Sequence, residues 1–599
     1  FWPQGEGDLR MQNPYWIAYR NLRLNNKKRY MASAGLSYQI LDWLNVAGRV
    51  RIDNTHSEYE GKLYASSSNT LTDGSSQGHY TVNNGQYSQT YADVLVNINK
   101  RIQDFTIVAN IGASYSGVTS KELGYAGPIR ETGIPNLFNV YDLDNAKKRA
   151  TQVGWREATE SIFASAEVGW KSMLYLTVTG RNDWASQLTH SPQASFFYPS
   201  VGLSAVITEM LKLPDWVDYL KVRGSFSSVG NPYPRFLTYP TYSYDANKQD
   251  WKSQTNYPIG KLYPERTDSW EVGLDATLFK DFKLSGSFYY ANTYNQTFDP
   301  RLPVSSGYDK LYVQTGYVRN YGFEAMLSYG HRWGDFGWDS SFTFSANKNE
   351  IVELVKDYVH PETGKTYNVD KLELKTDEGR GFGKAKFILK EGGTLGDLYT
   401  HADLKRDING NILIDDSGNV TAIDNAGDIK LGSVLPKANL AWNNSFSYKG
   451  INAGFLLTAR LGGIVYSATQ AYLDLYGVSE TSAAARDAGG VWINGRSHVN
   501  PQSFYEVVAS QSGLPTYYTY SATNLRLQEA HIGYTVPRRW LGNVCDINVS
   551  LVGRNLWMIY CKAPFDPEAV ATTNNYYQGI DYFMMPSTRN IGFNIKINF

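Results

Sequence analysis

The chain has 599 residues and a mass of 67.3 kDa, and its 57 Lys and Arg residues balance 57 Asp and Glu residues. This zero net charge leaves no net field to recruit nucleic acid or an acidic substrate. Charged residues make up only 19% and aromatic residues 14%, which suits surfaces where rings lie half in water. No run of about 18 apolar residues occurs and the mean hydropathy is −0.40, which excludes a helical membrane protein but not a β-barrel.

The most regular feature of the chain is a strict alternation of apolar and polar residues. A period of two is that of a β-strand, and helical spacing of apolar residues is hardly seen, so the sequence predicts an all-β fold. The apolar members of the clearest stretches are Leu44, Val46, Val50 and Ile52; Phe105, Ile107, Ala109 and Ile111; Trp270, Val272, Leu274, Ala276 and Leu278; Ala453, Phe455, Leu457, Ala459 and Leu461; and Ile591, Phe593, Ile595, Ile597 and Phe599.

Charged residues on the second face of these strands distinguish a membrane fold from a soluble one. A soluble β-sandwich also alternates, but many of these stretches run past the about 10 residues that a tilted spanning strand needs. In a soluble barrel the apolar face would line the interior. Charges such as Arg49, Asp275 and Arg460 on the other face indicate a polar lumen with lipid outside. We therefore predict a transmembrane antiparallel β-barrel with these three side chains facing the lumen.

Short and long connections alternate along the chain and predict about seventeen strands. Outer-membrane barrels have short periplasmic turns and long extracellular loops. We expect residues 1–27 to be extracellular and residues 28–599 to form the barrel. The long extracellular loops are expected near 61–86, 118–154, 230–264, 351–433, 467–519 and 560–583.

Aromatic residues in the loop near 230–264 are candidates for substrate contact. Exposed rings are what sugars or peptide side chains stack upon, although docking of another protein or packing within the loop explains them equally well. The candidates are Tyr239, Tyr242, Tyr244 and Trp251.

Catalytic and metal-binding motifs are weak. The eight histidines show no i, i+4 pair, and His190 near Ser186 and Asp183 is the only loose arrangement for nucleophilic catalysis. Residues 407–419 half resemble a calcium loop but lack the bidentate Glu, so two tight turns are the better interpretation. We therefore expect no enzyme activity, no cofactor and no metal.

Several short segments, taken in order, match the motifs of one transporter family. Residues 262–273 read L-x-P-E-x-T-x-x-W-E-x-G and residues 320–324 read N-x-G-F-E, and three further matches lie at 13–16, 525–537 and 553–556. Together they resemble the SusC-type (RagA-like) TonB-dependent outer-membrane transporters of Bacteroidetes. Phe599 is similar to the terminal aromatic residue of the family's outer-membrane assembly signal.

This resemblance implies a 22-strand barrel with an N-terminal plug, a TonB box and a SusD-like lipoprotein lid, and with import of oligosaccharides or oligopeptides powered through TonB. It also allows a dimer of transporter and lipoprotein pairs. The plug is not expected within this segment, and five strands of the 22 would be absent with it. A siderophore or cobalamin receptor and a barrel-anchored adhesin that transports nothing are the alternatives.

Three local features are expected from the strand assignment. Cys545 and Cys561 lie at opposite ends of one strand, about 50 Å apart at about 3.3 Å per residue, so they are expected to be unbonded. The apolar parity changes between Leu527 and Ala530, which predicts a β-bulge near Gln528. The first and last strands are expected to be unpaired edges of an open sheet.

Overall fold

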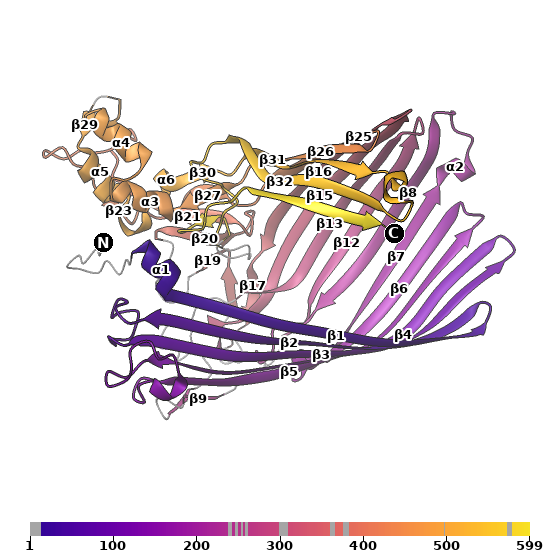
Figure 1. The fold of residues 1–599 in the computed structure, drawn as a ribbon, viewed down its shortest axis with the longest axis horizontal. Coiled ribbons are helices and arrows are strands. Elements are labelled where there is room, and N and C mark those ends of the chain that lie inside the picture. Colours follow the sequence, from indigo (N-terminus) through magenta and orange to yellow (C-terminus); the bar gives the residue numbers. More distant parts are fainter. Residues whose placement is uncertain are drawn as a thin grey trace.

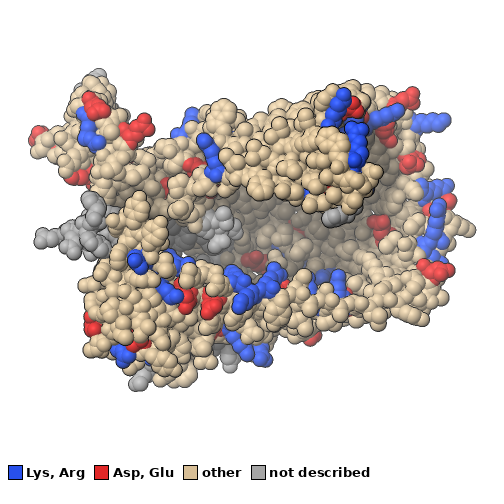
Figure 2. All heavy atoms as spheres, in the orientation of Figure 1, with Lys and Arg blue, Asp and Glu red and all other residues tan. Residues whose placement is uncertain are grey.

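The computed structural model describes residues 13–237, 242–245, 250–252, 256–257, 262–298, 310–359, 364, 366–374, 383–495, 497–571 and 578–598. Its main element is a 17-stranded antiparallel sheet that curves around a deep trough (Figures 1 and 2). This confirms the predicted all-β barrel wall and its strand number. The strands are β1 (Asn21–Leu41), β2 (Leu44–Tyr64), β3 (Gly78–Ile102), β4 (Phe105–Pro128), β5 (Arg149–Trp170), β6 (Leu174–Ala185), β7 (Ser195–Val206), β8 (Val217–Asn231), β12 (Glu265–Leu278), β13 (Phe282–Phe298), β15 (Val313–Trp333), β16 (Phe336–Glu353), β25 (Ala438–Tyr448), β26 (Ile451–Leu461), β31 (Asn524–Val536), β32 (Asp546–Cys561) and β34 (Asn590–Asn598).

The register of the sheet gathers the apolar side chains of successive strands on one face. Leu457 on β26, for example, lies opposite Trp442 on β25 and Leu527 on β31. These side chains are not covered by other parts of the described chain, and Val272 and Leu551 are 60% and 56% exposed. A continuous apolar face of this extent is the lipid-facing surface of a membrane barrel.

The strands are longer than the sequence predicts, because they continue past the apolar band. β3 has 25 residues and β4 has 24, more than twice the about 10 needed to span the membrane. Backbone pairing persists where both faces become polar, as between Glu58 on β2 and Asn84 on β3. Alternation of hydrophobicity marks only the membrane portion of a strand, so it underestimates strand length.

Several predicted boundaries are therefore wrong. The barrel begins at Asn21 rather than at residue 28, because β1 already pairs with β2 there. The connections predicted at 61–86 and 118–154 shrink to 65–77 and 129–148, and those at 351–433, 467–519 and 560–583 become 354–437, 462–523 and 562–589. The loop at 230–264 lies at 232–264, close to its prediction.

The local predictions hold where the described residues test them. Gln528 has no partner on β26, since Leu456 pairs with Glu529 and Leu457 with Leu527, which confirms the β-bulge. Cys545 and Cys561 are both free; Cys545 directly precedes β32 and Cys561 is its last residue.

The two margins of the sheet are open. Among the described residues, β1 pairs with β2 and β34 pairs with β32, and no ladder joins β1 to β34. The two strands run along the margins of the opening in Figure 1, where β1 is indigo and β34 is yellow. This confirms the two unpaired edge strands.

Short helices and strands lie in the long connections at one end of the barrel, in the segment before β1, and in the turns from β7 to β8 and from β31 to β32 at the other end (Figure 1). They are α1 (Pro14–Arg20), α2 (Ile207–Met210), α3 (Ala468–Leu475), α4 (Glu480–Asp487), α5 (Pro501–Val508), α6 (Pro515–Tyr518), η1 (Val140–Asp142), η2 (Ser186–Leu188), η5 (Ser510–Ser512), η6 (Arg538–Leu541), β9 (Ser243–Asp245), β10 (Asp250–Lys252), β11 (Asn256–Tyr257), β14 (Lys310–Leu311), β17 (Val355–Val359), β18 (Thr366–Val369), β19 (Lys371–Leu374), β20 (Ala385–Lys390), β21 (Asp397–Thr400), β22 (Asp403–Leu404), β23 (Ala422–Ile423), β24 (Ile429–Ser433), β27 (Ile464–Ser467), β28 (Val491–Ile493), β29 (Ser497–Val499), β30 (Thr519–Ser521) and β33 (Ile580–Asp581).

The buried apolar cores lie among these connections and not inside the trough. One core packs the 354–437, 462–523 and 562–589 connections around Phe387, Leu398 and Tyr466, and another surrounds Phe504 and Leu514. The long loops are therefore small folded layers, while the trough itself stays open to polar solvent. None of the helices among the described residues has the length and apolarity to cross a membrane.

An arginine introduced at either of two neighbouring positions on β26 should have opposite effects, because the two side chains lie on opposite faces of the sheet. Leu457→Arg places a charge on the apolar face, which costs about 2–4 kcal/mol near the middle of a membrane. Thr458→Arg places the same charge on the polar face and should leave assembly intact. We expect Leu457→Arg alone to lower the amount of folded barrel in outer-membrane fractions, measured by heat-modifiable gel mobility. Equal amounts of the two variants would contradict the assigned faces.

Candidate functional site

The three predicted lumen residues lie on the polar face, where each already has a partner. The Arg49 guanidinium lies 2.7 Å from the Asp93 carboxylate. Asp275 accepts from Arg223 at 2.6 Å on one oxygen and from Ser285 at 2.7 Å on the other. The Arg460 guanidinium donates to the backbone carbonyl oxygen of Val434, in the connection before β25, at 2.7 Å. These contacts tie neighbouring strands and a loop together, so the three residues hold the wall of the lumen.

A polar cavity of about 770 Å³ occupies the concave side of the sheet. Its lining includes Arg223 on β8 and Arg460 on β26, which are six strands apart along the sheet, so the wall must curve round the cavity. A second cavity of about 620 Å³ shares Glu324, Ser345 and Asn439 with the first. The two form one continuous cleft below the long connections.

The cleft is rich in hydroxyl and amide groups. Its polar lining residues include Ser285, Ser287, Thr343, Ser345, Asn347, Asn349, Thr394, Asn439, Thr458 and Gln528. Among its charged groups, Glu324 is exposed and makes no hydrogen bond or ion pair with any residue that the structure describes. An unpaired carboxylate facing a cavity is free to accept hydrogen bonds from a ligand, and the sequence analysis did not single out Glu324.

The N-x-G-F-E segment explains how Glu324 comes to face the cleft. Asn320, Gly322 and Glu324 share the polar face, while Phe323 is exposed on the lipid side. A Cβ at Gly322 would lie 2.3 Å from a backbone oxygen and 2.5 Å from the Tyr289 hydroxyl, so only glycine fits there. Asn320, Gly322 and Glu324 are spaced two residues apart, so their side chains share one face of the strand. This spacing could have identified Glu324 from the sequence.

The segment at 262–273 builds the neighbouring ion-pair network. Glu271 lies 3.5 Å from Arg223, which also binds Asp275. A Cβ at Gly273 would come within 2.6 Å of the Arg223 guanidinium, so glycine leaves the room in which Arg223 reaches both carboxylates. Leu262, at the other end of the segment, is buried in a core at the rim.

The connection at 562–589 is fastened to the wall beside the cleft by a buried ion pair. Arg526 on β31 donates to both carboxylate oxygens of Asp566, at 2.9 and 3.2 Å, and lies 3.3 Å from Glu568. The side chains of Arg526 and Asp566 are 6% and 10% exposed. Burial alone would raise the pKa of Asp566, but hydrogen bonds from Arg526 and the backbone hold it below the ordinary value. The pair positions Glu568 in the lining of the cleft.

Of the aromatic candidates in the 232–264 connection, Tyr239 lies outside the described residues. Tyr242, Tyr244 and Trp251 are 68%, 52% and 65% exposed. Tyr244 on β9 and Trp251 on β10 pair across a two-stranded ribbon, with ring centroids 5.2 Å apart. The structure therefore presents these rings to solvent, while their role in substrate contact stays a prediction. Phe599 also lies outside the described residues.

The residues considered for nucleophilic catalysis and for calcium binding make hydrogen bonds within the protein. The Asp183 carboxylate accepts from Arg181 and Tyr198, and the Ser186 hydroxyl accepts from a backbone amide. Asp407 and Asp415 each accept from two backbone amides of their own tight turns. Within the described residues, His, Cys, Asp and Glu side chains form no group suited to a metal ion.

An antiparallel wall with an apolar outer face and a polar cleft inside defines a transmembrane β-barrel. The family model for the TonB dependent receptor-like β-barrel matches residues 3–556, and the chain belongs to this family. This membership bears out the resemblance stated from the motifs.

Relatives and solved structures extend the comparison. TonB-dependent receptor P3 of Formosa agariphila is 23% identical over 98% of this chain and 60% of its own length. SusC of Bacteroides thetaiotaomicron is 24% identical over 66% of this chain and 40% of its own. The RagAB peptide importer in its closed-closed state superposes with a TM-score of 0.74 at 17% identity, over 98% of this chain and 64% of that one. The chain thus spans about 60% or less of the curated relatives it matches.

The buried ion pair predicts a local opening of the 562–571 segment when it is broken. Arg526→Ala leaves Asp566 buried without its cation, which costs about 3–5 kcal/mol. We expect faster hydrogen exchange and proteolytic cleavage within 562–571. Arg554→Ala removes a largely exposed pair with Glu529 and serves as the matched control. Equal protection of the segment in both variants would show that the pair does not hold it.

Proposed function

We propose that this chain is the barrel part of an active importer that moves oligosaccharides or oligopeptides across the outer membrane of a Gram-negative bacterium of Bacteroidetes type. The observation that carries the proposal is the polar cleft on the concave face, with its hydroxyl and amide lining and the unpaired Glu324. Such groups make many weak hydrogen bonds, which hold a long polar ligand without trapping it. Family membership and the SusC and RagAB relatives support the same role.

We infer two protein partners, and the SusC and RagAB relatives support them. A SusD-like lipoprotein would cover the long connections, and TonB would deliver energy through an N-terminal plug region. Binding beneath the lid, energised movement of the plug and release inward would complete a cycle in which no bond is made or broken. A dimer of transporter and lipoprotein pairs is compatible with this arrangement.

The exposed rings of Tyr242, Tyr244 and Trp251 would serve as the first contacts of the substrate in the outer vestibule. Rings at this position stack on sugar faces or peptide side chains before the ligand enters the cleft. The neutral balance of 57 basic and 57 acidic residues offers no special attraction for an anionic siderophore, the main alternative cargo.

A bulky residue in the cleft should block transport without harming the barrel. Thr343 is exposed on the concave face and lines the cleft, whereas its neighbour Phe342 faces lipid. We expect Thr343→Trp in the full-length protein to reduce uptake of labelled oligosaccharide or oligopeptide several-fold, measured in a transporter-deletion strain. Phe342→Trp should transport normally at the same outer-membrane level.

The same assay separates the alternatives. Uptake that requires TonB and the proton motive force supports active import. Uptake only of ferric siderophore or cobalamin would favour a receptor of that class. Surface attachment without any TonB-dependent uptake would favour an adhesin and overturn the proposal.

A further inference from the structure

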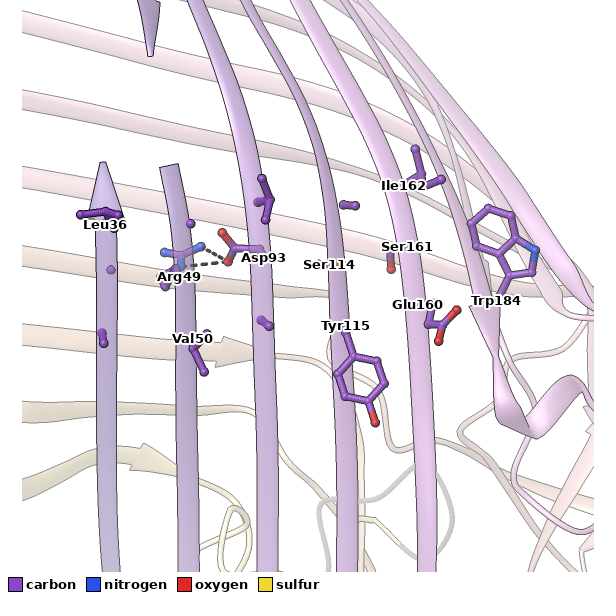
Figure 3. Close-up of a pocket in the computed structure, with 16 residues that line it drawn as sticks. Leu36, Arg49, Val50, Asp93, Ser114, Tyr115, Glu160, Ser161, Ile162 and Trp184 are labelled. Atoms are coloured by element: carbon purple, nitrogen blue, oxygen red, sulfur yellow. Dashed lines mark hydrogen bonds and ion pairs between the residues drawn. The ribbon is translucent and has the colours of Figure 1, made fainter. Parts of the chain in front are cut away.

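An apolar hollow of about 950 Å³ lies on the lipid-facing side of the wall, across β1 to β6 (Figure 3). Its larger outward side chains include Leu36, Val94 and Ile162, each more than half exposed. The small side chains of Ala92 and Ala113 lie beside them and leave room on the surface. The hollow is therefore a depression in the face that lipid tails contact.

Tyr115 marks the level at which this outward face turns from apolar to polar. It is ten residues after Phe105, the first residue of β4 beyond the short turn. Ten residues span about 33 Å, which at barrel tilt is about 25 Å, the height of the apolar band of such barrels. The register pairs Tyr115 with Glu160 on β5, and Glu160 with Trp184 on β6, and Figure 3 shows the three together. The outer boundary of the hydrocarbon therefore runs along these three residues.

Two polar hollows continue this outward face beyond the boundary, toward the long connections. The nearer hollow measures about 320 Å³ and shares Tyr115 with the apolar hollow, and the farther one measures about 690 Å³. Hydroxyl, amide and imidazole side chains line them from the outward face: Ser88, Thr90 and Thr119 in the nearer hollow, and His56, Asn84, Gln86 and Gln152 in the farther one. An occupant of all three hollows needs apolar tails and a large polar head.

Each polar hollow contains a cation that the chain does not neutralise. Arg156 lines the nearer hollow and Lys121 the farther one, and both are exposed. Neither makes a hydrogen bond or ion pair with a residue that the structure describes. Arg156 pairs with Thr119, so the two cations lie four and six residues beyond the level of Tyr115, about 10 and 15 Å at barrel tilt. Their long side chains can extend back toward the boundary.

The carboxylates on this outward face lie away from the two cations. Glu58 is on β2, two strands from the cation on β4. Glu160 is four residues from Arg156 along β5, about 13 Å, which exceeds the Debye length of about 8 Å at physiological salt. The alternation of the strands places Glu122 and Glu157 on the lumen side. The polar hollows are therefore locally positive.

We propose that the three hollows bind one phosphorylated glycolipid of the outer leaflet. Its acyl chains occupy the apolar hollow, its sugar lies against the serine and threonine hydroxyl groups, and its phosphates bind Arg156 and Lys121. Both residue types bind phosphate, and an arginine donates two parallel hydrogen bonds to it. Glu160 accepts from sugar hydroxyl groups at the boundary, where the rings of Tyr115 and Trp184 offer stacking surfaces. The inference rests on the placement of the barrel in the outer membrane and not on its cargo.

The chemistry of the outer membrane supplies such a ligand. Its outer leaflet consists largely of lipopolysaccharide, whose lipid A anchor is an acylated and phosphorylated disaccharide. A second copy of the chain is a poorer occupant, because a two-fold contact centred on this surface would bring the cations of both copies toward each other. Lipid A satisfies the apolar hollow and both cations at once.

Binding of purified lipid A to the full-length protein tests the site. The protein is extracted from outer membranes in mild detergent, freed of lipid by detergent exchange, and titrated with one of three lipids. These are diphosphoryl lipid A, the same lipid A after removal of its phosphates, and phosphatidylglycerol, which is anionic but has no sugar. Native mass spectrometry gives the number bound per protein. We expect one diphosphoryl lipid A per protein, bound at least about fivefold more tightly than either of the others.

Substitutions in the hollows separate the phosphate contacts from the contacts of the tails. Lys121→Gln combined with Arg156→Gln should weaken binding of diphosphoryl lipid A about tenfold, since two partly exposed charge contacts are lost, and should leave the dephosphorylated form unaffected. Lys121→Arg combined with Arg156→Lys keeps both charges and should bind normally. Ala113→Trp should fill the apolar hollow and weaken binding of both forms of lipid A.

Two control variants separate the site from general effects on the barrel. Lys212→Gln removes an exposed cation from the turn between β7 and β8, at the opposite end of the barrel. Ala166→Trp enlarges an outward residue of β5 outside the three hollows. Both should bind lipid A as the wild type does. Equal binding of the three lipids, unchanged binding by the double glutamine variant, an equal loss in Lys212→Gln, or a dimer that Ala113→Trp dissociates would overturn the proposal.

Discussion

The backbone hydrogen bonds of this protein have to be satisfied between strands, because lipid offers no partner for an exposed N–H or C=O group. Each strand pairs with the next of the set along the chain, and this pairing fixes which side chains share a face. A shift of the pairing register by one residue would move all apolar side chains of a strand from the lipid-facing side to the lumen side. The bulge at Gln528 restores the parity of β31 where its sequence changes phase.

The same constraint shapes the inner face. Polar side chains that line a wide lumen are costly to leave unpaired beside low-dielectric walls, and pairs such as Arg49 with Asp93 and Arg223 with Asp275 satisfy each other across strands. Groups left over from this pairing are then available to a ligand. Glu324 is such a group inside the trough.

The connections contain most of the buried apolar side chains because the trough itself is open. The cores around Tyr466 and Phe504 give the long loops a fold of their own, and the Arg526–Asp566 pair ties one of them to the rim. Folded loops held at a few points form a vestibule of defined shape, which a flexible connection would not provide.

The sequence by itself determined the number of strands, which residues face the lipid, the bulge and the family. Each of these depends on the alternation of apolar and polar residues along a strand or on a short motif. It did not determine where strands such as β3 end, since pairing continues after hydrophobic alternation stops. Nor did it identify the cleft around Glu324. The cleft brings together residues from Arg223 on β8 to Gln528 on β31, which are far apart in the chain, and only the curvature and register of the finished sheet decide which of them meet.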